Sequence, residues 1–182
     1  MKELLNIVDD NDNIIGEADR AEIHAQGLLH REINIFFITP DRKIIFQHRS
    51  KNKDTNPDLL YATVAGHVEI GHSYEETAVK EAMEETGVKI NVSDLMFICK
   101  TKKCFIDEIS KKINNSFKCK YAYIYRGEIS DLKVEDGEAV GFEVYSIDQL
   151  LNLSVLDKIK FNRSALEYAT KELAEFINKL EL

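Results

Sequence analysis

Short apolar runs, separated by turn-forming residues, divide the start of the chain into strands. LLNIV at 4–8 and IIGEA at 14–18 flank the run DDNDN, so we expect them to pair as a hairpin. A short helix should follow over 20–26, because Asp19 can cap its first turn and Gly27 can end it. The pattern therefore predicts a hairpin followed by a helix.

Two longer apolar runs predict strands in the middle of a sheet. INIFFIT at 33–39 is continuous enough for a buried strand, and KIIFQHR at 43–49 returns beside it after a turn at Pro40. A polar loop at 50–58 leads to a further strand-like segment, YATVAGHV at 61–68. The first two of these strands should be antiparallel neighbours.

The rest of the chain mixes helices and strands. A helix is expected over 73–86, since Ser73 and Glu76 form a capping-box pattern and Gly87 can end the helix. Two strands are expected next, at 95–106 and 117–126, joined by the polar loop DEISKKINNS. After an acidic loop at 131–139, we expect a strand at 140–146, a helical turn at 147–152 and an amphipathic helix at 162–180. The apolar stripe of the last helix could face a partner, but core packing is the interpretation that we adopt.

Hairpin-forming strands mixed with a few helices favour a layered α/β (α+β) domain over a doubly wound one. The length of 182 residues fits one domain with a sizeable core. No repeat, low-complexity tract or linker divides the chain. We therefore expect a single domain over residues 1–182, with the hairpin and helix of residues 1–30 packed on its core.

Charge and composition narrow the possible functions. The formal net charge of −8 argues against nucleic acid as a partner, whereas a small phosphorylated ligand is compatible because a divalent cation reverses the local field. The longest apolar run is too short to cross a membrane, and the acidic N-terminal stretch is unlike a signal peptide. The three cysteines form no CxxC pair. These features predict a cytoplasmic protein with reduced thiols.

The helix expected over 73–86 carries three neighbouring acidic residues, Glu81, Glu84 and Glu85. At about 100° per residue they share a sector of roughly 100°. They could form a solvated acidic face, or they could supply the hard oxygen ligands that Mg²⁺ and Mn²⁺ prefer. A glycine-containing loop before the helix, where backbone carbonyls can approach an ion, favours the second interpretation. The opposite face, which should pack on the sheet, consists of Val79, Ala82 and Met83.

The segment 66–88 resembles the Nudix box, G-x5-E-x7-R-E-U-x-E-E-x-G-U, in which U is aliphatic. The matching positions are Gly66, Glu81, Glu84, Glu85, Gly87 and Val88. His72 stands where the pattern has Glu, Lys80 replaces Arg, and Ala82 replaces a bulkier aliphatic residue. On this pattern the chain is identified as a member of the Nudix superfamily.

The Nudix resemblance implies an α/β/α sandwich with a mixed central sheet, and metal-dependent cleavage of a diphosphate joined to another group. By that resemblance Glu81, Glu84 and Glu85 bind Mg²⁺ or Mn²⁺, helped by the backbone carbonyl of Ala65 or Gly66. One of these glutamates, or a nearby loop carboxylate, would take the proton from the attacking water. Nudix relatives are often dimers, so the resemblance also allows a homodimer.

Three further positions bear on this site. Lys80 joins the catalytic set because the family's Arg braces a catalytic glutamate, although Lys lacks the bidentate fork. His72 could contact a phosphate or the metal, or simply be a surface residue. Glu138 is our choice for the additional metal-binding carboxylate that the family often places before the strand matching 140–146. A solvated charge run is the alternative for the acidic loop.

A second resemblance covers most of the first half of the chain. VDDNDNIIGEADR, GLLHREINIFFI and HRSKNKDTNPD resemble type I isopentenyl-diphosphate isomerases and their hydrolase relatives. It implies that His24, His30 and His67 match metal-binding histidines, and that Arg49 and Lys53 match residues contacting the diphosphate. We assign Arg49, Lys53, His30 and His67 to the substrate site. The alternatives are a structural hydrogen bond for His30 and a solubilising role for the two cations.

The isomerases also need a Cys and a Glu on opposite sides of the allylic carbon. Ala65 occupies the Cys position, and the Glu position near Phe117 and Lys118 has no carboxylate. The hydrolase branch is therefore favoured, with a small nucleotide-like or other diphosphate as substrate and loops 50–60 and 107–116 as its selectors. The alternatives are isomerase-like activity and a non-catalytic nucleotide-binding module, the latter motivated by Lys80 and His72.

Overall fold

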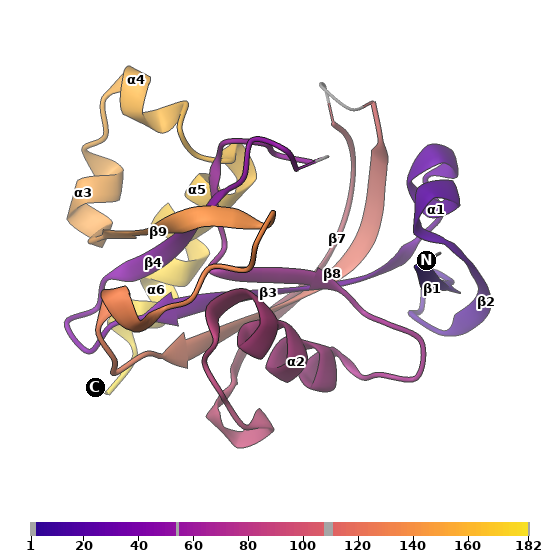
Figure 1. Cartoon of the computed structure of the whole chain (residues 1–182), viewed down its shortest axis with the longest axis horizontal. Coiled ribbons are helices and arrows are strands. Elements are labelled where there is room, and N and C mark those ends of the chain that lie inside the picture. The colour runs from indigo at the N-terminus through magenta and orange to yellow at the C-terminus, as the bar shows by residue number, and fades with distance from the viewer. Residues whose placement is uncertain (1–2, 54, 108–110, 182) are drawn as a thin grey trace.

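The computed structural model describes residues 3–53, 55–107 and 111–181 of the chain (Figure 1). Its strands are β1 (Leu4–Val8), β2 (Ile14–Asp19), β3 (His30–Ile38), β4 (Ile44–Arg49), β5 (Leu60–Tyr61), β6 (Val64–His67), β7 (Met96–Ile106), β8 (Ile113–Ile124) and β9 (Ala139–Tyr145). Its α-helices are α1 (Arg20–Gln26), α2 (Tyr74–Thr86), α3 (Ile147–Leu151), α4 (Val155–Lys158), α5 (Arg163–Thr170) and α6 (Glu172–Asn178). Short 3-10 turns occur at Val92–Asp94 and Ile129–Asp131.

The central sheet is mixed. Its main path runs β5-β4-β3-β8-β7, while β6 pairs with β3 and β9 pairs with β4. β3 and β8 are parallel, with Glu32 opposite Lys118 and Asn34 opposite Lys120. The remaining pairs in this sheet are antiparallel. The parallel pair places residues about 86 positions apart in sequence side by side at the centre of the sheet.

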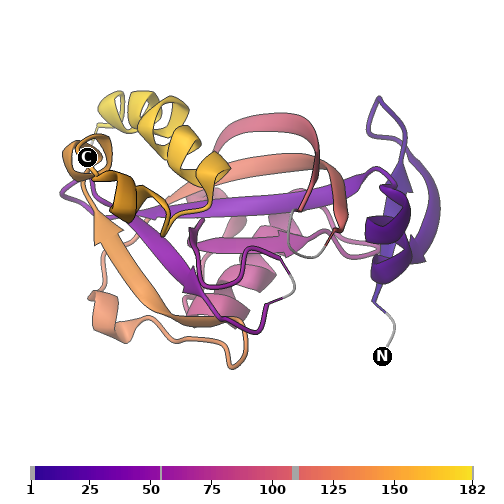
Figure 2. The same ribbon diagram turned by 90° about the horizontal axis from the view of Figure 1, so that it is seen from above.

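Helices cover both faces of this sheet, and Figure 2 shows α2 and the C-terminal helices on opposite sides of it. Ile35 and Phe37 of β3 point into the cluster beneath α2, whereas Phe36 and Ile38 point into the cluster beneath α5 and α6. Because side chains alternate along a strand, a strand buried on both faces must be apolar throughout. The expected α/β/α sandwich with a mixed sheet is confirmed.

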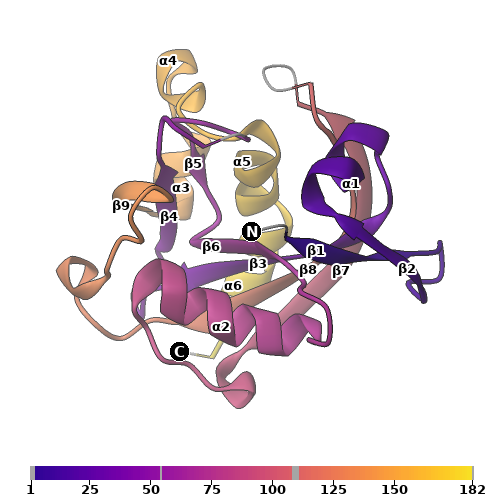
Figure 3. The same cartoon turned by 45° about the vertical axis from the view of Figure 1, so that its right-hand side comes forward.

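The N-terminal hairpin and α1 lie at one end of the sheet (Figure 3). They have a small apolar cluster of their own around Leu5, Ala18 and Ile23. Asp12, at the turn of the hairpin, bonds to residues of β3 and α2 and so connects this unit to the central sheet and its helix. Arg31 Nε donates to its carboxylate at 2.6 Å, and the Tyr74 hydroxyl donates to it at 3.0 Å. We propose that these contacts make residues 1–30 part of the same folding unit as the core.

The local helix signals are confirmed. Asp19 caps α1 and Gly27 ends it in the left-handed conformation, with φ of 67°. Ser73 and Glu76 form the full capping box of α2, and Gly87 ends that helix with φ of 71°. Each signal acts within one turn of chain, which is why the sequence alone is sufficient to locate it.

Three expected elements have different bounds. The strand expected over 61–68 is broken, because the chain leaves β4 after β5 and joins β3 as β6. Thr63 sits at this crossing, where its hydroxyl accepts a hydrogen bond from the Phe37 backbone N–H at 2.8 Å. The helix expected over 162–180 is interrupted at Lys171, which has φ of −119° and ψ of −93°. Just before it, Thr170 donates back to the Leu166 carbonyl, which competes with helix continuation.

β8 begins at Ile113, inside the segment expected to be a polar loop, because it pairs with β7 as far as Ile106. The rest of that expected loop includes residues 108–110, which lie outside the described part of the chain. α4 was not predicted from the sequence. The three cysteines are free thiols, and among the described residues no helix is long and apolar enough to cross a membrane.

Candidate functional site

The site starts from the close approach of α2 to β6. A Cβ added to Gly66 would lie 2.4 Å from Cδ of Glu81, which is closer than real Cβ contacts allow. The Glu81 carboxyl group therefore rests directly on the β6 backbone, in space that only a glycine leaves open. This contact explains the spacing between the first glycine and the first of the three glutamates.

Glu85 is buried, with 2% of its surface exposed, and its carboxylate accepts a hydrogen bond from Gln47 Nε2 at 2.8 Å. The expectation that all three glutamates point away from the core is wrong for Glu85. Met83, expected to pack on the sheet, is 53% exposed. The physical reason is that the small side chains of Ala78 and Ala82 form the buried face, and Glu85 follows them at helical spacing on that face.

Burial and mutual repulsion raise the pKa of two of these carboxyl groups. Burial raises the pKa of Glu81 to about 8, and the charge of Glu84 adds to the effect. Burial also raises the pKa of Glu85 well above its usual range, with Glu81 and Glu138 adding to it. Crowded, buried carboxylates that resist ionisation are stabilised by a cation, so this donor set fits a hard divalent metal ion.

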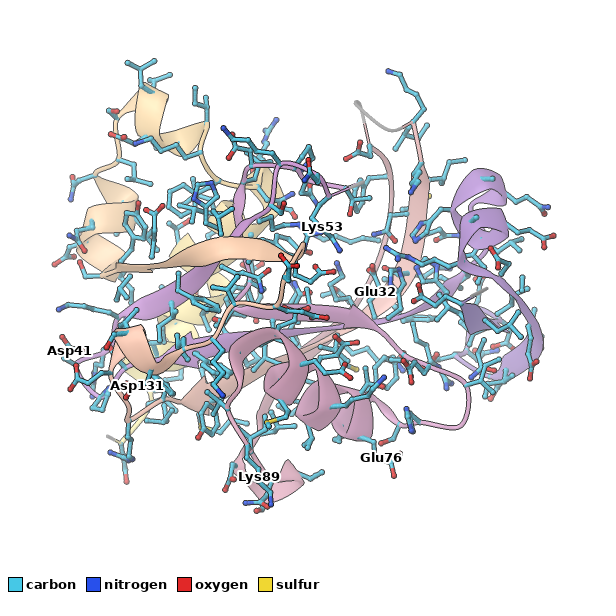
Figure 4. All side chains as sticks on the ribbon, in the orientation of Figure 1. Glu32, Asp41, Lys53, Glu76, Lys89 and Asp131 are labelled. Carbon is cyan, nitrogen blue, oxygen red and sulfur yellow. The ribbon has the colours of Figure 1, made fainter. Side chains whose placement is uncertain are left out.

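The two cations expected from the sequence, Arg49 and Lys53, line the same cavity as the glutamates, which has a volume of about 350 Å³. Lys53 forms an ion pair with Glu138. Arg49 is 6% exposed, and its guanidinium lies 5.9 Å from the ring centroid of Tyr61. Lys53 and Glu32, which both line this cavity, lie toward the middle of the molecule in Figure 4. Of the sequence-predicted site residues, the cavity lining includes Arg49, Lys53, Gly66, His67, Glu81, Glu84, Glu85 and Glu138.

Lys80 is not among the lining residues, but it contacts the site indirectly. Its Nζ lies 2.5 Å from a Glu69 oxygen and 3.8 Å from a Glu84 oxygen. His72 Nδ1 lies 3.5 Å from the other Glu69 oxygen. The Nudix pattern has a Glu at the position of His72. Glu69, three residues before His72, places a carboxylate close to that position. Sequence reasoning missed Glu69 because it lies outside the pattern's register.

Glu135 also lines the cavity and was not chosen from the sequence. Burial and the charges of Glu138 and Glu84 raise its pKa. The acidic loop thus brings at least two carboxylates, Glu135 and Glu138, to the cavity. The charge run alone gave no way to distinguish them, because their placement depends on the turn before β9.

Three histidines form a largely buried cluster that reaches this cavity through His67. The ligand atoms of His24, His30 and His67 lie within 4.8 Å of one another. His30 Nδ1 donates to the Leu28 carbonyl at 3.0 Å, and its Nε2 is buried with no hydrogen-bond partner among the described residues. Burial lowers the pKa of His67 and of His24, which keeps both rings neutral. Neutral imidazoles with an unpaired ring nitrogen fit a metal ion.

A buried ion pair connects the two groups of residues. Lys118 Nζ lies 3.1 Å from Glu32 and 2.9 Å from the Tyr61 hydroxyl, and Ser116 donates to Glu32 at 2.6 Å. Burial alone would raise the pKa of Glu32, but the charge of Lys118 and the hydrogen bond from Ser116 hold it below its usual range. His67 Nε2 lies 3.6 Å from the other Glu32 oxygen. Sequence reasoning missed Glu32, because its partners lie on β8 and β6.

Comparison with known proteins agrees with this geometry. A model of the NUDIX domain matches residues 28–167. An uncharacterized Nudix hydrolase of Clostridium acetobutylicum is 32% identical over 152 residues, which cover 82% of this chain and 72% of that protein. Isopentenyl-diphosphate Delta-isomerase 2 of Photorhabdus laumondii is 36% identical over 87 residues, 48% of this chain and 49% of that protein. The chain spans about half the length of several such relatives.

Two solved structures share the fold. A crystal structure from Deinococcus radiodurans has a TM-score of 0.63 at 24% identity, covering 99% of this chain and 100% of that one. The NUDIX domain of Shewanella oneidensis NrtR, complexed with ADP ribose, has a TM-score of 0.60 at 14% identity, covering 87% and 98%. The domain match and the Clostridium relative together show that the chain belongs to the Nudix hydrolase family.

Proposed function

We propose that this chain hydrolyses small diphosphate-containing substrates in a metal-dependent reaction. The observation that carries the proposal is the single cavity in which Glu81, Glu84 and Glu85 lie with Arg49 and Lys53. Carboxylates suit a hard divalent cation, and the two basic side chains suit phosphate oxygens. The ADP ribose bound by the NUDIX domain of Shewanella oneidensis NrtR supports a nucleotide-like diphosphate as the substrate type.

Glu81, Glu84 and Glu85, with the Gly66 carbonyl and Glu138, are the residues that would hold Mg²⁺ or Mn²⁺. When bound, the ion supplies charge neutralisation for the phosphates and a water of lowered pKa. Two of these carboxylates are already fixed, since Glu81 rests on the β6 backbone and Glu85 accepts from Gln47. Preorganised donors need little rearrangement during the reaction.

The remaining cavity residues would position the substrate and move the proton. Arg49 and Lys53 would bind the diphosphate oxygens and orient the scissile anhydride. Glu135 would accept the proton of the attacking water, because burial and neighbouring carboxylates raise its pKa toward the working range of a general base. Lys80, linked to Glu69 and Glu84, would brace Glu84 in the manner of the family's Arg.

Isomerisation is the less favoured reaction. Ala65 lines the cavity where the isomerases have their Cys, and a methyl group neither donates nor accepts a proton. Near the expected Glu position, Lys118 is already paired with Glu32. The similarity to an isomerase covers about half of this chain. It supports a common origin of the two sites, but it does not support the isomerase reaction.

We also propose that the buried histidines form a second metal site, as the resemblance to the isomerases implies. His24, His30 and His67 are the residues that would hold the ion, with Glu32 close to His67. The unpaired Nε2 of His30 supports this assignment over direct substrate binding, because His30 is fully buried and is not among the lining residues of the substrate cavity.

The first prediction concerns turnover. Incubation with Mg²⁺ or Mn²⁺ and a panel of nucleotides, nucleotide sugars and isoprenyl diphosphates should release phosphate or a nucleoside monophosphate. Glu85→Gln should lower the rate by about 100-fold or more, because it removes one charge from the metal cage while keeping the shape of the side chain. Tight binding without turnover of any compound would indicate the non-catalytic module, and double-bond migration would indicate the isomerase.

The second prediction concerns Gly66. Gly66→Ala should lower activity by about 100-fold, because the new methyl group forces the Glu81 carboxyl group out of position. Gly141→Ala is the matched control, since a Cβ there meets no atom within 4 Å. Initial rates and circular dichroism of both variants check the result. Unchanged activity in Gly66→Ala would show that the position of Glu81 does not matter for the reaction.

The third prediction concerns the histidines. His30→Ala should remove one equivalent of tightly bound transition metal, because it deletes the buried nitrogen that has no hydrogen-bond partner among the described residues. His48→Ala is the control, as His48 is half-buried and interacts with Asp58 outside the cluster. Metal content is measured by plasma mass spectrometry after dialysis against Mn²⁺ or Zn²⁺. Equal metal content in both variants would contradict the histidine site.

A further inference from the structure

A second and larger cavity, of about 870 Å³, lies next to the proposed catalytic cavity. Asn34, Tyr61 and Lys118 line both cavities, so the two adjoin one another. The larger one lies between the face of β3, β8 and β7 and the start of α5. A substrate whose diphosphate lies between Arg49 and the glutamates would have this space available for the rest of the molecule.

Lys120 is the unusual residue of the second cavity. It is 7% exposed, and its ammonium group lies 3.6 Å from the ring centroid of Tyr168. No carboxylate of the described chain lies within ion-pair distance of it. Lys118, two residues earlier on the same strand face, is paired with Glu32. A buried ammonium group without a counter-ion is costly, and accordingly burial lowers the pKa of Lys120 to about 8.

Other features of this cavity also favour a polar, negatively charged ligand. The side-chain oxygens of Asn34 and Thr101 are buried there with no hydrogen-bond partner among the described residues. Lys103 adds a further cation to the lining, besides Lys118 and Lys120. Arg163 opens α5, although Glu167 already accepts a hydrogen bond from it at 2.9 Å. An anionic group of a ligand could accept a hydrogen bond from the Thr101 hydroxyl and lie near the lysines, whereas the Asn34 oxygen needs a donor such as a ligand hydroxyl.

The lining is also partly apolar, which limits the kind of ligand. Phe36, Tyr168 and Ile106 contribute rings and aliphatic surface beside the polar groups. A free inorganic anion would leave this surface uncovered. An organic body, such as a ribose and base, would cover it while presenting an anionic group to Lys120.

We propose that the second cavity binds the part of the substrate beyond the scissile diphosphate, and that this part carries an additional anionic group, such as a sugar phosphate, beside Lys120. The inference rests on the proposed function, and it narrows the substrate class. It selects diphosphates that bear a further phosphate remote from the bond to be cleaved. Lys120 is then a specificity-determining residue and not a catalytic one.

Matched compounds that differ by one remote phosphate test the inference by equilibrium binding. NADPH is compared with NADH, and coenzyme A with dephospho-coenzyme A, by titration calorimetry in EDTA, so that no turnover occurs. The wild-type chain should bind the phosphate-bearing member of at least one pair about tenfold more tightly, as expected for a charge-assisted contact. Lys120→Met should remove this preference, and Lys120→Arg should retain it.

Lys89→Met is the matched control, because Lys89 is an exposed lysine outside the lining of both cavities (Figure 4). It makes the same change of charge and should leave the preference unchanged. Equal wild-type affinities within both pairs, or a preference that survives in Lys120→Met, would overturn the inference.

Hydrolysis of the same pairs with Mg²⁺ separates this inference from the proposed function. A preference in binding together with no hydrolysis of any diphosphate would refute the proposed function and leave the anion site standing. Hydrolysis that is lost in Glu85→Gln, but without any preference in binding, would refute the anion site alone.

Discussion

The packing of α2 against the β6 backbone is the constraint on which the rest of the site depends. Glu81 can rest on β6 only because Gly66 has no side chain, and the helix can approach only because Ala78 and Ala82 are small. The consequence is that Glu81, which is half-buried, and Glu85, which is fully buried, lie in one site with raised pKa values. Such an arrangement is unfavourable in isolation, and a bound cation would stabilise it.

The parallel pairing of β3 and β8 determines which polar side chains line the two cavities. It places Glu32 opposite Lys118 and Asn34 opposite Lys120. One strand face therefore carries a lysine paired with a carboxylate and then a lysine that has no carboxylate partner in the described chain. Lys118 borders the proposed catalytic cavity as well as the larger one, whereas Lys120 lines only the larger. The register of β3 and β8 therefore places the Glu32–Lys118 ion pair and the candidate ligand contact, Lys120, at neighbouring positions on one strand face.

Local signals explain what could be predicted from the sequence. The ends of α2 follow from its capping residues, Ser73 and Glu76, and from Gly87. The register of the Nudix box identifies Glu81, Glu84 and Glu85 as the candidate metal ligands. The burial of Glu85 could not be predicted, because it depends on how α2 is rotated over the sheet and on Gln47 from a distant strand. Glu32 and Lys120 were missed for a similar reason, since their environment is set by strand pairing and by the position of Tyr168.

Anomalous diffraction from crystals grown with Mn²⁺ would locate the cation directly. We expect a peak within coordination distance of the Glu81 and Glu85 carboxylates and close to the Gly66 carbonyl, which is the geometry that the contact between α2 and β6 prepares. Mn²⁺ sites confined to the exposed acidic surface, with the buried carboxylates bare and their positions unchanged, would contradict a metal cage at this helix.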